Sequence, residues 1–168
     1  MPENFIAFVK QRSERSFRNL LQELEGLTPE EALRDHHPRW PGQQWGIGQD
    51  GSIAGIIYHV AAWKTLTLPL LQPGGQAIPQ AQFNAASVPA PDDWPGLIAW
   101  LTQIGTEFQA ALTQLPESAF EETRAWEGMT LPLWKIVVEM YEHDIQHAAQ
   151  VAYLRQRNAA QWAAGQGL

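Results

Sequence analysis

Helical periodicity recurs four times in this chain, and it limits the possible folds more than any other feature of the sequence. In each stretch apolar residues return every three or four positions, which places them on one face of an α-helix. Sustained alternation of apolar and polar residues, the pattern of a half-buried strand, is not found. The stretches run from about residue 3 to 25, from 52 to 69, from 93 to 115, and from 130 to beyond 153. We therefore predict an all-α fold, a four-helix bundle with long loops and short accessory helices.

Capping signals mark the ends of these predicted helices. The residues expected to open helices are Thr28, Asp50 or Ser52, Asp93 and Thr130. Thr28 has Glu31 three residues later, which predicts a capping box and a short helix. We expect Pro132 in the first turn of the fourth helix, because proline suits that position. Gly26 should stop the first helix, the second should falter near Pro69, and Pro116 should end the third.

Two segments lack any period and are predicted to be loops. They are His36–Asp50, rich in Pro, Gly and Trp, and residues 72–93. Connections this long are uncommon in compact domains and are usually functional. Several of the eight tryptophans fall in connecting segments, which suggests loops packed over the helices as lids or rims. These tryptophans are Trp40, Trp45, Trp94 and Trp126.

Length, charge and cysteine content narrow the function. The 168 residues fit a single domain, residues 1–168, with its own core. The formal net charge of -7 is spread along the chain, which disfavours binding to nucleic acid or to an anionic membrane. With no cysteine, any metal must be held by imidazole and carboxylate. We expect a cytoplasmic protein, because the sequence has no signal peptide and no run of roughly 18 apolar residues.

Three histidines fall on inward helical faces. His143 and His147 are four residues apart, so their side chains lie about 40° apart and one turn from each other. They interrupt an apolar stripe on the fourth helix, and His59 stands in the middle of a similar stripe on the second. Three converging imidazoles would leave coordination positions open, as catalytic metal sites require. The ion could be Zn²⁺, Ni²⁺, Co²⁺ or Fe²⁺, because nitrogen ligands do not select sharply among them.

A simpler explanation competes with the metal site. A histidine pair at positions i and i+4 is more often a surface pair or a pair with ordinary hydrogen-bond partners. The independent inward position of His59 favours a metal site, because burying three imidazoles without partners would destabilise the fold by on the order of a few kcal/mol. Among nearby acids, Glu139 lies one turn before His143 and is the tentative general base. Glu107 is interpreted as a boundary carboxylate, and His36 and His37 as solvated loop residues.

Asp144 is unusual because it falls on the apolar arc of the fourth helix. Three roles are open for it: accepting the free N–H of a ligand histidine, pairing with Arg155, or serving an interface. The arc itself spans Ile136 through Tyr141 and is wide enough to predict burial on more than one side, by loops or by a second subunit. We expect a homodimer.

Three segments carry a likeness to known proteins: LTPEEAL after the first helix, GSIAGIIYHVAAW, and LWKIVVEMYEHDIQHAAQVAYLR. In these segments the chain resembles the DinB/YfiT superfamily of small metal-binding four-helix proteins. The resemblance implies a metal triad with one histidine from the second helix and two from the fourth, that is His59, His143 and His147. The resemblance also implies a type of reaction, because characterised relatives include transferases that use bacillithiol or mycothiol, with a metal that activates the thiol.

These observations predict a metal-dependent enzyme, a thiol S-transferase or a hydrolase that acts on a small-molecule substrate. A low-molecular-weight thiol is a possible cosubstrate, and a negatively charged thiol would need a cation near the mouth of the site. The basic residues considered for this are Arg12, Arg15 and Lys64. The alternatives are a stress-associated module that binds or senses a metal or ligand without turnover, and a structural protein whose histidines hydrogen-bond in the core.

Overall fold

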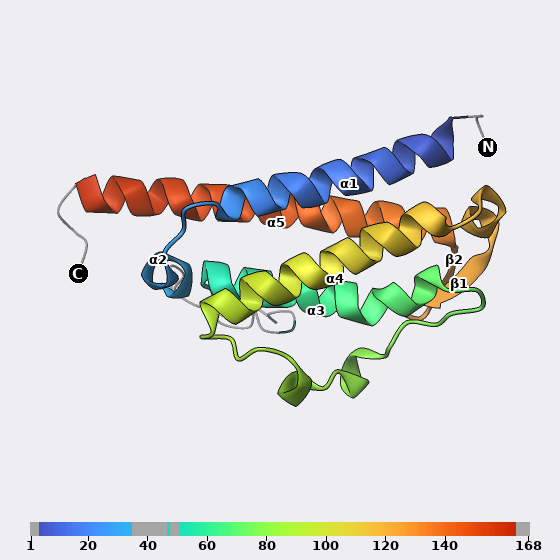
Figure 1. The fold of residues 1–168 in the computed structure, drawn as a ribbon, viewed down its shortest axis with the longest axis horizontal. Coiled ribbons are helices and arrows are strands. Elements are labelled where there is room, and N and C mark those ends of the chain that lie inside the picture. The colour runs from blue at the N-terminus through green and yellow to red at the C-terminus, as the bar shows by residue number, and fades with distance from the viewer. Residues whose placement is uncertain (1–3, 35–46, 48–50, 164–168) are drawn as a thin grey trace.

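The computed structural model describes residues 4–34, 47 and 51–163, and it confirms the all-α expectation. Figure 1 shows the long helices packed side by side as a bundle. The α-helices are α1 (Phe5–Leu24), α2 (Pro29–Leu33), α3 (Ile53–Thr67), α4 (Trp94–Gln114) and α5 (Leu133–Ala163). Short 3₁₀ helices are η1 (Leu68–Leu71), η2 (Gln80–Gln82), η3 (Ala85–Ser87) and η4 (Glu117–Glu121).

The bundle is built from two closely packed helix pairs, α1 with α5 and α3 with α4, as Figure 1 shows. Helix α3 also packs against α5 across the core. Nearly every residue of α3 is buried, because its sequence is apolar on all sides. Contrary to the expectation that no segment has the length and apolar character of a membrane span, Ile53–Leu71 has both, yet most of it lies inside the bundle, as in the core helix of a soluble protein.

Most of the predicted helix ends are confirmed. Thr28 and Glu31 form the reciprocal capping box that opens α2. The side chains of Ser52 and Asp93 accept the backbone N–H of the third residue after them and so cap α3 and α4. Gly26 follows the end of α1 with a φ of 76°, the left-handed conformation that glycine adopts readily.

The connections agree in part with the prediction. Helix α3 gives way to η1 around Pro69, as expected. The long connection over residues 72–93 is present and contains only η2 and η3. Most of the predicted loop His36–Asp50, with its tryptophans and the alternative cap Asp50, lies outside the described residues.

The prediction that Thr130 caps the fourth helix is wrong. The structure has an antiparallel hairpin there, formed by β1 (Thr123–Trp126) and β2 (Met129–Pro132), and α5 begins only at Leu133. Pro132 ends the second strand instead of entering the first helical turn. Each strand has four residues, too few for alternation to stand out, although the turn at Glu127 and Gly128 has the positive φ angles (47° and 78°) typical of tight hairpins.

A polar layer separates two apolar parts of the core. One cluster of buried apolar side chains lies at each end of the bundle. On α1, α3 and α5, buried polar residues come between the residues of one cluster and those of the other. They are Ser13, Ser16, Lys64, Thr67, Asp144 and His147.

Lys64 and Asp144 form a buried ion pair in this layer and join α3 to α5. Lys64 Nζ donates to Asp144 Oδ2 over 2.8 Å, and the two side chains are 3% and 1% exposed. The ammonium also lies 5.1 Å from the ring centroids of Phe17 on α1 and Phe108 on α4, so the pair contacts all four long helices. Burial raises the pKa of the Asp144 carboxyl, and the neighbouring ammonium opposes that rise.

This pair corrects two expectations. Lys64 lies in the core and does not stand at the mouth of a site, where it was expected to attract an anionic thiol. Asp144 takes none of its three expected roles, since its partner is Lys64 and Arg155 donates to the backbone carbonyls of Glu23 and Glu25. Apolar periodicity placed both residues on helices. It could not reveal that they pair, because they are 80 residues apart in the sequence and no local pattern marks such a contact.

Replacing only one partner of this pair should destabilise the fold strongly. Asp144→Leu leaves the Lys64 ammonium buried without a counter-charge, so the free energy of unfolding should fall by about 3–5 kcal/mol. The double variant Lys64→Met with Asp144→Leu removes both charges and should be about as stable as the wild type. Guanidinium unfolding in the presence of a chelator, followed by circular dichroism, measures both. Equal losses in the single and double variants would contradict this.

Candidate metal centre

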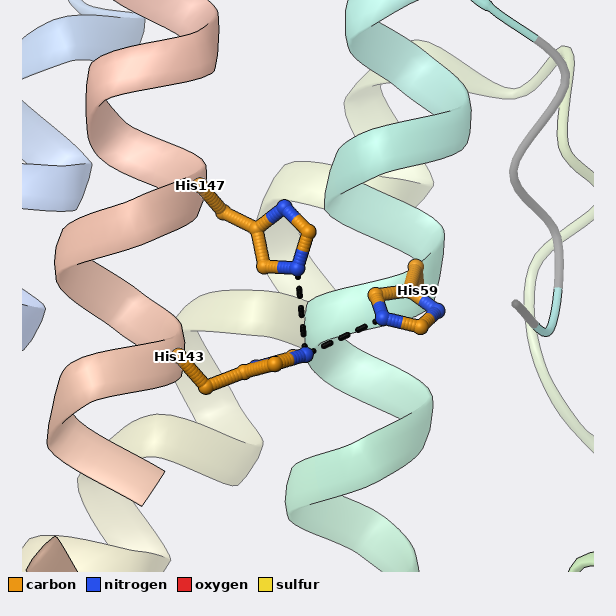
Figure 2. Close-up of side chains that lie close together, drawn as sticks. All are labelled: His59, His143 and His147. Carbon is orange, nitrogen blue, oxygen red and sulfur yellow. Dashed lines mark hydrogen bonds between the residues drawn. The ribbon is translucent and has the colours of Figure 1, made fainter. Parts of the chain in front are cut away.

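The structure brings the three predicted histidines together. His59 extends from α3 toward α5, where His143 and His147 stand one turn apart on the same face (Figure 2). His143 Nε2 lies 3.0 Å from His59 Nε2 and 3.1 Å from His147 Nε2. One nitrogen from each ring lies within 4.8 Å of the others. The imidazoles therefore converge on one point, although they come from positions 84 residues apart.

Hydrogen bonds at the other ring nitrogens fix the tautomers of two histidines. His59 Nδ1 lies 3.1 Å from the backbone carbonyl of Ile47, and His147 Nδ1 lies 2.8 Å from Gln150 Oε1. Both partners are oxygens that can only accept, so each Nδ1 carries the hydrogen. The Nε2 atoms of His59 and His147 therefore have lone pairs, and both face His143 Nε2, which lies within hydrogen-bond distance of each. Partners of this kind hold ligand histidines in many metal sites.

These two partners had not been assigned a role from the sequence. Gln150 belongs to the segment that resembles the superfamily motif, so a signal for it existed. The carbonyl of Ile47 had none, because a backbone acceptor can belong to any residue type.

The donor set fits a divalent transition metal. Nitrogens that bind one ion at about 2.1 Å are separated by about 3 to 3.5 Å, depending on the angle at the ion. Two of the three separations, 3.0 and 3.1 Å, fall in that range, and all three nitrogens lie within 4.8 Å of one another. In the part of the chain that the structure describes, the converging group consists of these three histidines alone. An all-imidazole set suits Zn, Cu, Fe and Ni better than Mg or Ca.

Burial keeps the three imidazoles neutral. It lowers the pKa of His59 to about 4 and that of His143 to about 2, and it lowers the pKa of His147 as well. Repulsion from the neighbouring imidazoles adds to the effect at His59 and His143. At neutral pH all three rings therefore have the lone pairs that metal binding requires.

An aromatic wall stands beside the triad. The Trp63 ring, one turn after His59 on α3, has its centroid 6.2 Å from that of His59 and 6.4 Å from that of His143. Trp126 packs edge-on against Trp63 with 5.5 Å between ring centroids. The expectation that Trp94 and Trp126 lie in connecting segments is wrong, since Trp94 is the first residue of α4 and Trp126 belongs to β1, and both are buried. Apolar surroundings of this kind lower the local dielectric at a polar site.

The other candidate residues lie apart from this group. Glu139 is exposed on α5, one turn before His143, and it is not among the converging donors of the described residues. Its role as a general base stays a prediction. Glu107 is exposed and accepts a hydrogen bond from Gln103, which agrees with its interpretation as a boundary carboxylate. His36 and His37 lie outside the described residues.

Comparison with known proteins finds a family match. The family model of the DinB superfamily matches residues 12–151, a range that includes all three histidines. No curated protein and no solved structure matches the chain.

The neutral triad predicts that metal-free protein loses stability in mild acid. Below about pH 6.5 the histidines of the unfolded chain bind protons, whereas His59 stays neutral in the folded state until about pH 4 and His143 until about pH 2. The free energy of unfolding should therefore fall as the pH drops from about 6.5, by about 1.4 kcal/mol per pH unit for each such histidine. Urea unfolding at a series of pH values, with a chelator present, measures this slope.

The variant His143→Gln is the matched control for this titration. Its slope between about pH 6 and pH 5 should be smaller than that of the wild type by the contribution of one histidine. The two proteins share their carboxylates, so the difference isolates the imidazole. Identical slopes would mean that His143 takes up its proton in the folded state as readily as in the unfolded chain.

Proposed function

This chain belongs to the DinB superfamily, and from that premise we propose that it is a cytoplasmic metal-dependent enzyme with His59, His143 and His147 as metal ligands. It acts as a thiol S-transferase or a hydrolase on a small, electrophilic molecule. The observation that carries the proposal is the convergence of three Nε2 atoms from two helices, two of them in a fixed tautomer.

The histidines, Trp63 and Glu139 have different roles in the proposed reaction. The three neutral imidazoles would hold a divalent ion and would leave room on it for a reactant. When bound, the ion supplies the Lewis acidity that lowers the pKa of a thiol or a water molecule toward neutrality. Trp63 packs edge-on against His59 and His143 and gives the site an apolar side. Glu139, exposed one turn before His143, accepts the proton that the thiol or water loses.

Metal analysis and a turnover assay test this proposal. Untagged protein should bind about one equivalent of a divalent transition metal per chain, and His59→Gln should reduce this below about a tenth of an equivalent. Glu107→Gln, which changes an exposed carboxylate away from the triad, should bind metal like the wild type. Metal-loaded protein should then convert electrophiles, with water or with one of a panel of low-molecular-weight thiols, beyond one equivalent of product.

The outcomes separate the competing functions. Wild-type protein with less than about a tenth of an equivalent of metal would overturn every metal-based function and favour a structural role. Full metal occupancy without turnover would favour the binding or sensing module.

A separate variant tests the role of Glu139 as the general base. Glu139→Gln should lower kcat by about 10²- to 10⁴-fold with unchanged metal content. Glu142→Gln, its exposed neighbour on α5, should leave kcat unchanged.

We also propose that the chain forms a homodimer, although the apolar arc of α5 gives it less support than expected. Ile136 and Val137 are already buried within one chain. Large apolar side chains that are exposed on the paired helices α1 and α5 include Phe8 on α1 and Ile145 and Tyr153 on α5, exposed by 50%, 41% and 59%. Sedimentation velocity should detect a dimer at micromolar concentration, and Ile145→Lys should shift it toward monomer. A wild-type protein that sediments only as a monomer would overturn this proposal.

A further inference from the structure

A cavity of about 460 Å³ lies beside the triad, between two irregular segments. One wall is the stretch 76–80 of the connection that follows α3, and the other is the turn of the β1–β2 hairpin. Both segments lie at the end of the bundle where α3 ends, as Figure 1 shows. Trp63 of α3 forms part of the lining. The volume is within the range of about 300–1,000 Å³ that is typical of small-molecule sites.

Both walls are held in place by the backbone. The amide of Ile78 donates to the carbonyl of Leu66 on α3 over 2.9 Å, which ties the connection to the bundle. Just before it, a Cβ on Gly75 would lie 1.8 Å from the Pro69 carbonyl oxygen, so this close approach requires glycine. On the other side, the antiparallel pairing of β1 with β2 holds the hairpin turn. The cavity is therefore a built feature of the fold.

Trp63 connects this cavity to the histidines. The same ring lines the cavity and lies edge-on to His59 and Trp126. A molecule in the cavity would thus be one indole away from the converging nitrogens. The inference that follows rests on the proposed function in one respect, because a bound molecule can react only if the histidines hold a metal. Binding in the cavity itself needs no metal.

The lining has a distinct chemistry. Two indoles, Trp63 and Trp126, and the side chain of Ile78 supply apolar surface, and Gln76 and Gln80 supply neutral polar groups. The charged lining residue is Glu127, and no Lys, Arg or His occurs among the lining residues that the structure describes. Indole faces and a carboxylate attract cations and repel anions.

We propose that this cavity binds the non-reacting part of the substrate, an aromatic group that carries a positive charge. Glu127 selects for the charge, and the two indoles bind the ring. An anionic thiol cosubstrate is excluded from this cavity and has to reach the triad from another side. The cavity therefore recognises the electrophile and not the thiol.

Three matched probes test the charge preference. They are naphthalen-2-ylmethylammonium, 2-naphthylmethanol and 2-naphthoate, which share one ring system and differ in charge. Isothermal titration calorimetry with the metal-free full chain should give a dissociation constant for the cation below about 1 mM and at least about tenfold lower than that for the anion. The alcohol should fall between them.

Two variants locate the preference in this cavity. Glu127→Gln should bring the affinity for the cation to that for the alcohol, whereas Glu117→Gln, an exposed glutamate of η4 outside the cavity, should change nothing. Ile78→Arg adds a positive charge at a side chain that is 37% exposed, so the fold should tolerate it, and the preference should reverse toward 2-naphthoate.

The results distinguish this inference from the proposed function. Equal affinities for the three probes, no binding of the cation below about 1 mM, or a preference that Glu127→Gln leaves unchanged would overturn the inference. Because the titrations use metal-free protein, a chain that binds no metal can still confirm the cavity. Conversely, turnover by a protein that fails to bind the cation would support the proposed function and overturn only the inference about what the cavity binds.

Discussion

The buried ion pair between Lys64 and Asp144 constrains how α3 lies against α5, and the position of the histidines depends on that constraint. Removing two charges from water is costly, and the attraction between them offsets this cost only in a good geometry. Here that geometry requires one register of α3 against α5. A slide of either helix by one turn would leave a charge unpaired in the core, so the pair specifies the register more strongly than apolar contacts do.

The same two helices carry the histidines, and this links the core to the site. Asp144 follows His143 directly, and Lys64 lies five residues after His59. The register that joins the charges therefore also brings His143 Nε2 to 3.0 Å from His59 Nε2. Pre-organisation of this kind lets the bundle hold three neutral imidazoles together before any ligand arrives. Their burial keeps them neutral, at the cost of stability in acid.

The sequence was sufficient for features that depend on local spacing. Apolar periodicity identified the long helices, caps such as Ser52 and Asp93 identified their starts, and the inward stripes identified the three histidines. The sequence was not sufficient where contacts between distant residues determine the local structure or the burial of a side chain. The hairpin that displaced Thr130 from its expected cap is stabilised by pairing and packing, and the depth of Lys64 is set by Asp144 on a distant helix.

The division between helices and irregular segments also separates two tasks. The proposed ligands lie on α3 and α5, whose positions the core determines, whereas the cavity is open to solvent and lined mainly by a connection and a hairpin turn. Loop segments tolerate change far better than packed helices do, because few core contacts depend on them. Substitutions at Ile78 or Glu127 could therefore alter which molecules bind, while the histidines and the ion pair stay in place. Trp63 is the exception, since it contacts both parts, and a change there should affect binding and the metal centre together.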